Sequence, residues 1–229
     1  MTTSTYKISV LFLFILGLCA VNFVKANHNP LPLFGKIIYL DPGHGGRDPG
    51  AIYKNIYESD INLAIAQKLE KVLEEYGAIV YSTRYGDYDL AVPYALNRKR
   101  SDLSRRVNII NRSLCDMYIS IHLNSETSST WYGAQVFYDD VHPENKEIAR
   151  IMQKVLKKHL RTRRAASEIS GMYIYRRVER PGILIEVGFL SNPNERYLLR
   201  KEWYQEKLAK VITEGVLQYF QNKQVPLNL

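Results

Sequence analysis

The 229-residue sequence contains little cysteine, and this limits how the folded chain can be stabilised. One of its two cysteines, Cys19, lies in an apolar N-terminal stretch that is typical of an export signal. Cys115 is then the only cysteine of the mature chain, so no internal disulfide can form. A single cysteine also excludes a closed structural zinc site of four cysteines, or of two cysteines and two histidines. Packing must therefore supply the stability.

The motifs of phosphate and nucleic-acid binding are absent as well. The loop "YLDPGHGGRDPGA", residues 39–51, is rich in glycine, but it contains neither G-x-x-x-x-G-K-[ST] nor a G-x-G-x-x-G that opens into a helix. There is no zinc-finger spacing, RNA-binding aromatic signature or helix-turn-helix pattern, so we expect no nucleic-acid partner. The histidine in this loop, His44, needs another explanation.

The N-terminus predicts export. Lys7 precedes an apolar run, Ile8 to Val24, and small residues follow where a signal peptidase cleaves. Residues 1–26 are therefore expected to be a signal peptide, or else an N-terminal membrane anchor, because the run is close to the length that crosses a bilayer. In either case the folded part lies outside the cytoplasm, and the membrane is contacted only through this segment.

The rest of the chain fits one domain. We expect a short linker at 27–35, a catalytic domain at 36–222 and a C-terminal tail at 223–229. Residues 1–26 contain Lys7 and Lys25 and no acid, so their removal lowers the formal charge from +8 to +6. An exported basic protein is expected to work beside an anionic surface. The basic stretches "NRKRSDLSRR" and "KKHLRTRR" are either solvated faces or surfaces for wall polymers, an acidic partner or the membrane.

Hydrophobic periodicity predicts alternating strands and helices. The expected strands are Ile37–Leu40, Ala78–Tyr81, Met117–Ile121, Ala134–Tyr138, Met172–Tyr175 and Ile183–Val187. The expected helices are Ile61–Leu73, capped by Ser59 or Asp60 and closed by Gly77, followed by Leu103–Ile110, Ile148–Leu160 and Trp203–Phe220. This order predicts the α/β class: a single domain with a mixed, mostly parallel, twisted sheet of about six strands and helices on both faces.

Polar residues stand at the strand ends of this pattern. His44 follows the first strand, His122 ends "MYISIH" and Glu186 lies near the end of "GILIEVG". In an open α/β sheet the carboxyl ends of parallel strands share one rim, and Glu58, just before the first helix, returns to it. Two imidazoles and two carboxylates are thus expected in one cleft.

Two neutral histidines and one carboxylate form a standard catalytic zinc shell. A second carboxylate would then move protons. A lone loop histidine is more often a turn residue, which is the alternative for His44 and His122. An acid within "ILIEVGFL" is costly to bury alone, so Glu186 requires a metal, a proton-transfer role or a firm ion pair. The remaining histidines, His28, His142 and His159, are not expected to be ligands.

Six stretches resemble the zinc-dependent N-acetylmuramoyl-L-alanine amidases of bacterial cell walls. They are "LDPGHGGRDPGA", "YESDINLAIAQKL", "TRYGD", "DLSRRVNIIN", "ISIHLNS" and "ILIEVGFLSNPNE", and the resemblance extends from Lys36 to Phe220. It implies that His44, Glu58 and His122 bind one Zn²⁺ and that Glu186 is the catalytic acid and base. The glycines around His44 would let the backbone turn sharply and present the imidazole at the rim.

The resemblance also implies the substrate, which is the amide between N-acetylmuramic acid and L-alanine in peptidoglycan. Arg47, beside His44, and Asn124, after His122, are the expected substrate contacts, with an ion pair to Asp48 or Asp41 as the alternative for Arg47. Arg106 is expected to anchor the fold through an ion pair.

Within the family, the chain is most similar to the germination-specific amidases of endospore formers. This similarity implies formation of muramic-δ-lactam in the spore cortex and an accessory lipoprotein as a partner. The alternatives are a vegetative wall amidase, a zinc peptidase that cuts elsewhere in peptidoglycan, and a non-catalytic wall-binding protein.

Overall fold

The computed structural model describes residues 31–169 and 176–224. The strands are β1 (Ile37–Pro42), β2 (Ile52–Tyr53), β3 (Ile56–Tyr57), β4 (Ile79–Ser82), β5 (Met117–Asn124), β6 (Gln135–Tyr138), β7 (Ser167–Glu168) and β8 (Gly182–Phe189). The helices are α2 (Glu58–Glu75), α3 (Arg98–Arg112), α4 (Asn145–His159), α5 (Pro193–Leu199) and α6 (Glu202–Gln224). Residues 1–26 and the expected strand Met172–Tyr175 lie outside the described residues. No helix of the described part is both long and apolar enough to cross a membrane.

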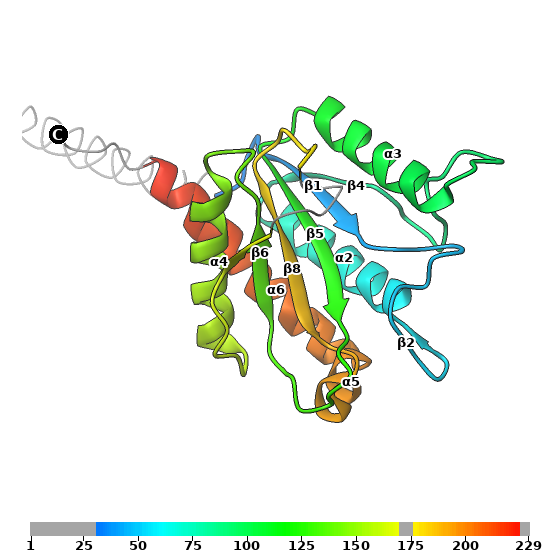
Figure 1. The fold of residues 1–229 in the computed structure, drawn as a ribbon. Helices are drawn as coiled ribbons and strands as arrows, with labels where there is room; N and C mark the ends of the chain where they lie inside the picture. Colours follow the sequence, from blue (N-terminus) through cyan, green and yellow to red (C-terminus); the bar gives the residue numbers. More distant parts are fainter. Residues whose placement is uncertain (1–30, 170–175, 225–229) are drawn as a thin grey trace, which may run out of the picture. The chain divides into compact units, whose positions relative to one another are not determined.

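Six strands form the main sheet in the order β4-β1-β5-β8-β6-β7 (Figure 1). The first four are parallel to one another, whereas β6 is antiparallel to β8 and β7 is parallel to β6. The expected α/β class, with a mixed and mostly parallel six-stranded sheet, is confirmed. The parallel strands β1, β5 and β8 end at the same edge, which is where parallel sheets place their binding sites.

Strand residues alternate between two buried faces of the sheet, so helices must cover both. On one face Leu40, Ile119 and Ile185 belong to the large core that includes residues of α2, α4 and α6. On the other face Tyr118 and Leu184 pack with Val107 and Ile110 of α3 (Figure 1). The expectation of helices on both faces is confirmed, with α3 covering the second face.

The start of α2 differs from the prediction. The helix begins at Glu58, and its N-cap residue is Tyr57, which makes no side-chain cap hydrogen bond, so the expected cap at Ser59 or Asp60 is wrong. The reason is that backbone carbonyls take the role of a cap: the Glu58 amide donates to Ala51 and the Ser59 amide donates to Pro49. The loop after β1 is thereby joined to the first turn of α2. Gly77 closes the helix as expected, with φ 92.

Four short elements are absent from the sequence prediction: β2, β3, β7 and α5. The hairpin of β2 and β3 and the strand β7 have two residues per strand, too few for periodicity to register. The seven-residue helix α5 does carry a local signal in "SNPNE". Asn192 accepts hydrogen bonds from the amides of Asn194 and Glu195, and Pro193 occupies the first helical turn.

A test of the core uses one buried and one exposed isoleucine. Ile119 is fully buried at the centre of the sheet, whereas Ile79 on the edge strand β4 is 45% exposed. Ile119→Ala is expected to lower the free energy of unfolding by about 2–5 kcal/mol, because it leaves a cavity. Ile79→Ala is expected to cost less than about 1 kcal/mol. Urea unfolding measures both, and equal losses would contradict this description of the core.

Candidate metal centre

In the loop after β1, His44 has an unusual backbone conformation, and glycines leave room beside it for two other side chains. His44 itself has φ 64, in the left-handed region. A Cβ on Gly43 would lie 2.1 Å from Cε1 of His122, and a Cβ on Gly50 would lie 2.6 Å from Oε2 of Glu58. Side chains at these two positions would occupy the space of the His122 ring and the Glu58 carboxylate. The glycines therefore make room for the cluster as well as turning the chain.

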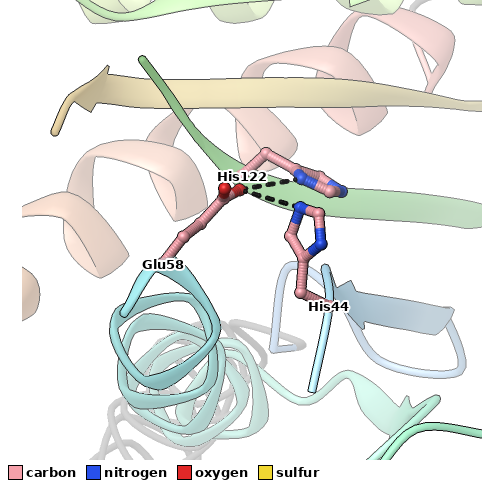
Figure 2. Close-up of side chains that lie close together, drawn as sticks. All are labelled: His44, Glu58 and His122. Carbon is pink, nitrogen blue, oxygen red and sulfur yellow. Dashed lines mark hydrogen bonds and ion pairs between the residues drawn. The ribbon is translucent and has the colours of Figure 1, made fainter. Parts of the chain in front are cut away.

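His44, Glu58 and His122 converge in space from three different elements. Figure 2 shows the two imidazole rings and the carboxylate pointing toward one another. Oε1 of Glu58 lies 3.3 Å from Nε2 of His44 and 3.0 Å from Nδ1 of His122. One ligand atom from each of the three residues lies within 4.8 Å of the others. The structure brings together all three residues that the sequence predicts as ligands.

This donor set fits a tetrahedral divalent cation. Zinc bonds to nitrogen and oxygen are about 2.0–2.1 Å long, so ligand atoms at two corners of a tetrahedron are about 3.3 Å apart. The two carboxylate-to-imidazole distances, 3.0 and 3.3 Å, have this length. Two imidazoles and one carboxylate are also the protein ligands of catalytic zinc sites that leave a fourth position for water or substrate.

Glu58 is held as a carboxylate. Its Oε1 accepts from the amide of Leu123 at 3.0 Å and from the side chain of Asn62 at 3.3 Å, and its Oε2 accepts from the amide of Ala51 at 2.8 Å. Burial alone would raise the pKa of Glu58, but the hydrogen bonds to the two imidazoles outweigh it and hold the pKa well below its usual range. A charged, fixed carboxylate is what a cation site needs.

The other nitrogen of His44 faces an acid. Nδ1 of His44 lies 3.0 Å from Oδ2 of Asp48, at ion-pair distance but without hydrogen-bond alignment. Burial lowers the pKa of His44, yet the neighbouring Asp48 and Glu58 raise it to about 9, while the contact with His44 lowers the pKa of Asp48 to about 2. Asp48 thus orients the imidazole so that Nε2 points toward Glu58.

Glu186 faces the same site from the neighbouring strand. Its Cα is the register partner of the His122 Cα, and both side chains point to the face of the sheet that α3 covers. Its Oε2 is buried without a hydrogen-bond partner among the described residues. Burial raises the pKa of Glu186 to about 7, against the opposing influence of His122. Glu58 and Glu186 are therefore neighbouring carboxyl groups whose pKa values are shifted in opposite directions.

These groups line one cavity of about 480 Å³ between the ends of the parallel strands and α3. Asn124 lines it too, whereas Arg47 lies outside it on the exposed part of the histidine loop. The lining residues are Asp41, Gly43, His44, Asp48, Ala51, Glu58, Lys99, Asp102, Leu103, Arg106, His122, Leu123, Asn124, Ser125, Leu184 and Glu186. The cavity opens to solvent.

Two buried arginines hold the histidine loop. Arg106 pairs with Asp41 at 2.7 Å and with Asp102 at 2.9 Å, and it donates to the carbonyl of His44 at 2.7 Å. The expected anchoring ion pair of Arg106 is confirmed. Arg84 was missed by sequence reasoning: it donates to the carbonyls of Pro42 and Gly43 and, at 2.8 Å, to Ser59 at the start of α2. "TRYGD" gives no local signal for this role, because all these partners are distant in sequence.

The fold and the site together define the class: this is an α/β protein with a candidate divalent-metal site and a second acid at the ends of its parallel strands. Comparison with known proteins gives the family. Residues 38–218 match the family model described as N-acetylmuramoyl-L-alanine amidase. The chain belongs to this amidase family.

Similar proteins agree with this assignment. The germination-specific N-acetylmuramoyl-L-alanine amidase of Bacillus subtilis is 48% identical over 200 residues, which cover 86% of this chain and 84% of that protein. The CwlD amidase of Clostridioides difficile, solved in complex with the GerS lipoprotein, is 38% identical with a TM-score of 0.78, covering 83% of this chain and all of that one. An N-acetylmuramoyl-L-alanine amidase of Clostridium difficile 630 has 33% identity and a TM-score of 0.73, with coverages of 82% and 98%. The resemblance read from the sequence motifs is confirmed, as is the enzyme class that it implied.

Gly43→Ala tests the space around the cluster. The added Cβ would overlap the His122 ring, so we expect the ring to be displaced and the affinity for Zn²⁺ to fall by about 10-fold or more. Isothermal titration calorimetry measures the affinity. Gly86→Ala is the matched control, because its Cβ would only meet the Tyr88 ring at 3.3 Å. Unchanged zinc affinity in folded Gly43→Ala protein would contradict the geometry of the site.

Proposed function

We propose that this chain hydrolyses the amide between the lactyl group of N-acetylmuramic acid and L-alanine in peptidoglycan, with one Zn²⁺ as cofactor. Membership of the amidase family supports this reaction. The observation that carries the proposal is the convergence of three ligand atoms within 4.8 Å, in the same cavity as Glu186. Cation ligands and a proton-transfer group thus meet where a substrate can reach both.

His44, Glu58 and His122 are the residues that would hold the zinc ion. When bound there, Zn²⁺ supplies a Lewis acid that polarises the amide carbonyl and lowers the pKa of water. Asp48 orients His44, and the amides of Ala51 and Leu123 fix Glu58. These contacts hold the Glu58 carboxylate and the His44 ring in place beside the candidate cation position.

Glu186 is assigned the proton transfers. As a carboxylate it takes a proton from the attacking water, whose oxygen bonds to the amide carbon. As a carboxylic acid it then gives that proton to the alanine nitrogen while the carbon–nitrogen bond breaks. The products are the lactyl carboxylate and a peptide with a free amino terminus. A pKa raised toward neutrality suits a group that must accept and release the same proton.

Asn124 is assigned a substrate contact. It follows His122 at the end of β5, is partly exposed, and lines the cavity beside the candidate ligands. A neutral amide can donate to and accept from the amide and hydroxyl groups of an amino sugar. Arg47 is not among the residues that line this cavity.

The biological role is proposed from the named relatives. The Bacillus subtilis relative is germination-specific, and the Clostridioides difficile amidase was solved with a lipoprotein. We extend both properties to this chain: action on spore cortex peptidoglycan outside the cytoplasm, leading to muramic-δ-lactam, with an accessory lipoprotein as partner. A vegetative wall role predicts instead that deletion spores keep normal muramic-δ-lactam.

Product analysis tests the reaction. Purified protein loaded with zinc is expected to release intact peptides with L-alanine at the amino terminus from peptidoglycan, as measured by mass spectrometry. Shortened peptides would identify a peptidase and overturn the proposal. Chelation is expected to abolish release, and added Zn²⁺ to restore it, because three ligands alone supply no Lewis acid.

Glu186→Gln tests the proton-transfer role. The substitution keeps the shape of the side chain but removes the proton acceptor, so we expect the rate of release to fall about 10²- to 10⁴-fold. Zinc content is expected to remain at one ion per chain, because Glu186 is not among the three candidate ligands. Full activity in the variant would eliminate this role for Glu186.

The dependence of kcat/KM on pH tests the same group. Glu186 must be ionised to accept a proton, so kcat/KM is expected to fall about tenfold per pH unit below its pKa. The raised pKa of about 7 applies without a cation, and a bound cation lowers it, so the acidic limb is expected between the ordinary 4.5 and about 7. The limb should not move when the zinc concentration is raised. A limb that shifts to lower pH with more zinc would report protonation of the histidine ligands instead.

A further inference from the structure

A second hollow of about 230 Å³ adjoins the main cavity. Asp48, Lys99 and Asp102 line both, so the two spaces adjoin at these residues, along the first turns of α3, and are together called the cleft. The remaining residues of the second hollow are Arg47, Asp89 and Arg98. None of these three takes part in the metal cluster or the proton transfers described above, so the proposed reaction leaves the second hollow without a role.

The six residues that line this hollow are three acids and three cations, but the ion pairs among the described residues leave two of the cations unpaired. Asp89 pairs with Arg98 at 2.8 Å, and Asp102 pairs with Arg106 at 2.9 Å. Asp48 lies 3.0 Å from Nδ1 of His44, and the charge of Lys99 also helps to lower its pKa. The expected alternative, an ion pair of Arg47 with Asp48 or Asp41, is wrong, because Asp41 pairs with Arg106 and Asp48 lies against His44. Neither Arg47 nor Lys99 forms an ion pair with any residue that the structure describes.

Both cations stand on backbone that is tied down. The amide of Gly46 donates to Asp87 at 2.7 Å, and the amide of Arg47 donates to Asp89 at 3.4 Å. These two hydrogen bonds hold the histidine loop against the segment that contains Asp87 and Asp89. Lys99 lies in the first turn of α3, directly after Arg98, which binds Asp89 through two nitrogens. Two exposed positive charges are therefore presented at one end of the cleft on fixed backbone.

We propose that this end of the cleft is the subsite for the acidic peptide on the leaving side of the scissile amide, with Arg47 and Lys99 binding its carboxylates. The inference rests on the proposed function and assigns a direction to the substrate. Asn124 and Ser125, which are neutral, line only the main cavity and suit the uncharged sugar. The charged peptide then extends from the metal cluster toward Arg47 and Lys99. Charge complementarity thus orients the polymer in an open cleft.

The test compares two ligands that differ only in charge. They are N-acetylmuramoyl-L-alanyl-D-glutamate with both carboxylates free, and the same compound with both carboxylates amidated. Calorimetry with Glu186→Gln protein, in which turnover is suppressed, is expected to show a preference of about 3- to 20-fold for the free acid, because exposed charge pairs are individually weak. The preference should shrink as salt is raised. When Arg47→Gln and Lys99→Gln are added to the Glu186→Gln protein, the ratio of the affinities for the free acid and the amidated ligand is expected to fall to about one.

The control removes the same charges elsewhere. Arg150 on α4 and Lys207 on α6 lie on helices that cover the opposite face of the sheet, so Arg150→Gln with Lys207→Gln is expected to keep the preference. No preference in the parent protein, or a preference that survives loss of Arg47 and Lys99, overturns the subsite. Hydrolysis distinguishes the two proposals. If the protein prefers the free acid but releases no dipeptide, the subsite is supported and the proposed function is wrong. If it hydrolyses the ligand without preferring the free acid, the proposed function is supported and the subsite is wrong.

Discussion

The buried ion pair between Arg106 and Asp41 is the interaction on which the site depends. Both side chains are almost fully buried, and desolvating two charges costs several kcal/mol each, which only close pairing and further hydrogen bonds can offset. Arg106 therefore also binds Asp102 and donates to the carbonyls of Pro42 and His44. One guanidinium thus joins α3, the end of β1 and the histidine loop, and it fixes one wall of the cleft relative to the sheet.

Two carboxyl groups then acquire different chemistry from their surroundings alone. Glu58 accepts hydrogen bonds from two backbone amides and Asn62, so its negative charge is stabilised. Glu186, one strand away from His122, has a buried oxygen without such a donor, and its proton is bound more tightly. The two imidazoles hold the pKa of Glu58 low in spite of its burial, whereas burial without a hydrogen-bond donor raises the pKa of Glu186.

The sequence predicts the parts of this arrangement that depend on local pattern. The strand ends at His44, His122 and Glu186 follow from apolar runs, and the parallel sheet brings them together. The predicted start of α2 is wrong because backbone carbonyls of the loop at 49–51 cap the helix. Every residue has such a carbonyl, so the residue types of the loop do not predict this cap. Arg84 was missed as a support of the site because its partners at Pro42, Gly43 and Ser59 are distant in sequence. Asp48 was missed although His44 lies only four residues before it, because the irregular loop has no periodicity that predicts the contact. Helix periodicity also treats the polar side of α3 as a solvated face.

That polar side of α3 explains how one helix performs two tasks. Lys99, Asp102, Leu103 and Arg106 are spaced at i, i+3, i+4 and i+7, so they form a single stripe, and all four line the cavity. Toward the C-terminal end of the stripe Arg106 is buried and held by two ion pairs, whereas at the N-terminal end Lys99 is exposed. Burial along the stripe therefore decreases from Arg106 toward the N-terminus of α3. Arg106 anchors the fold, and Lys99, two turns away, is exposed and can bind substrate. Because both lie on one helix, the position of the free charge relative to the metal cluster is set by the same ion pair that holds the histidine loop.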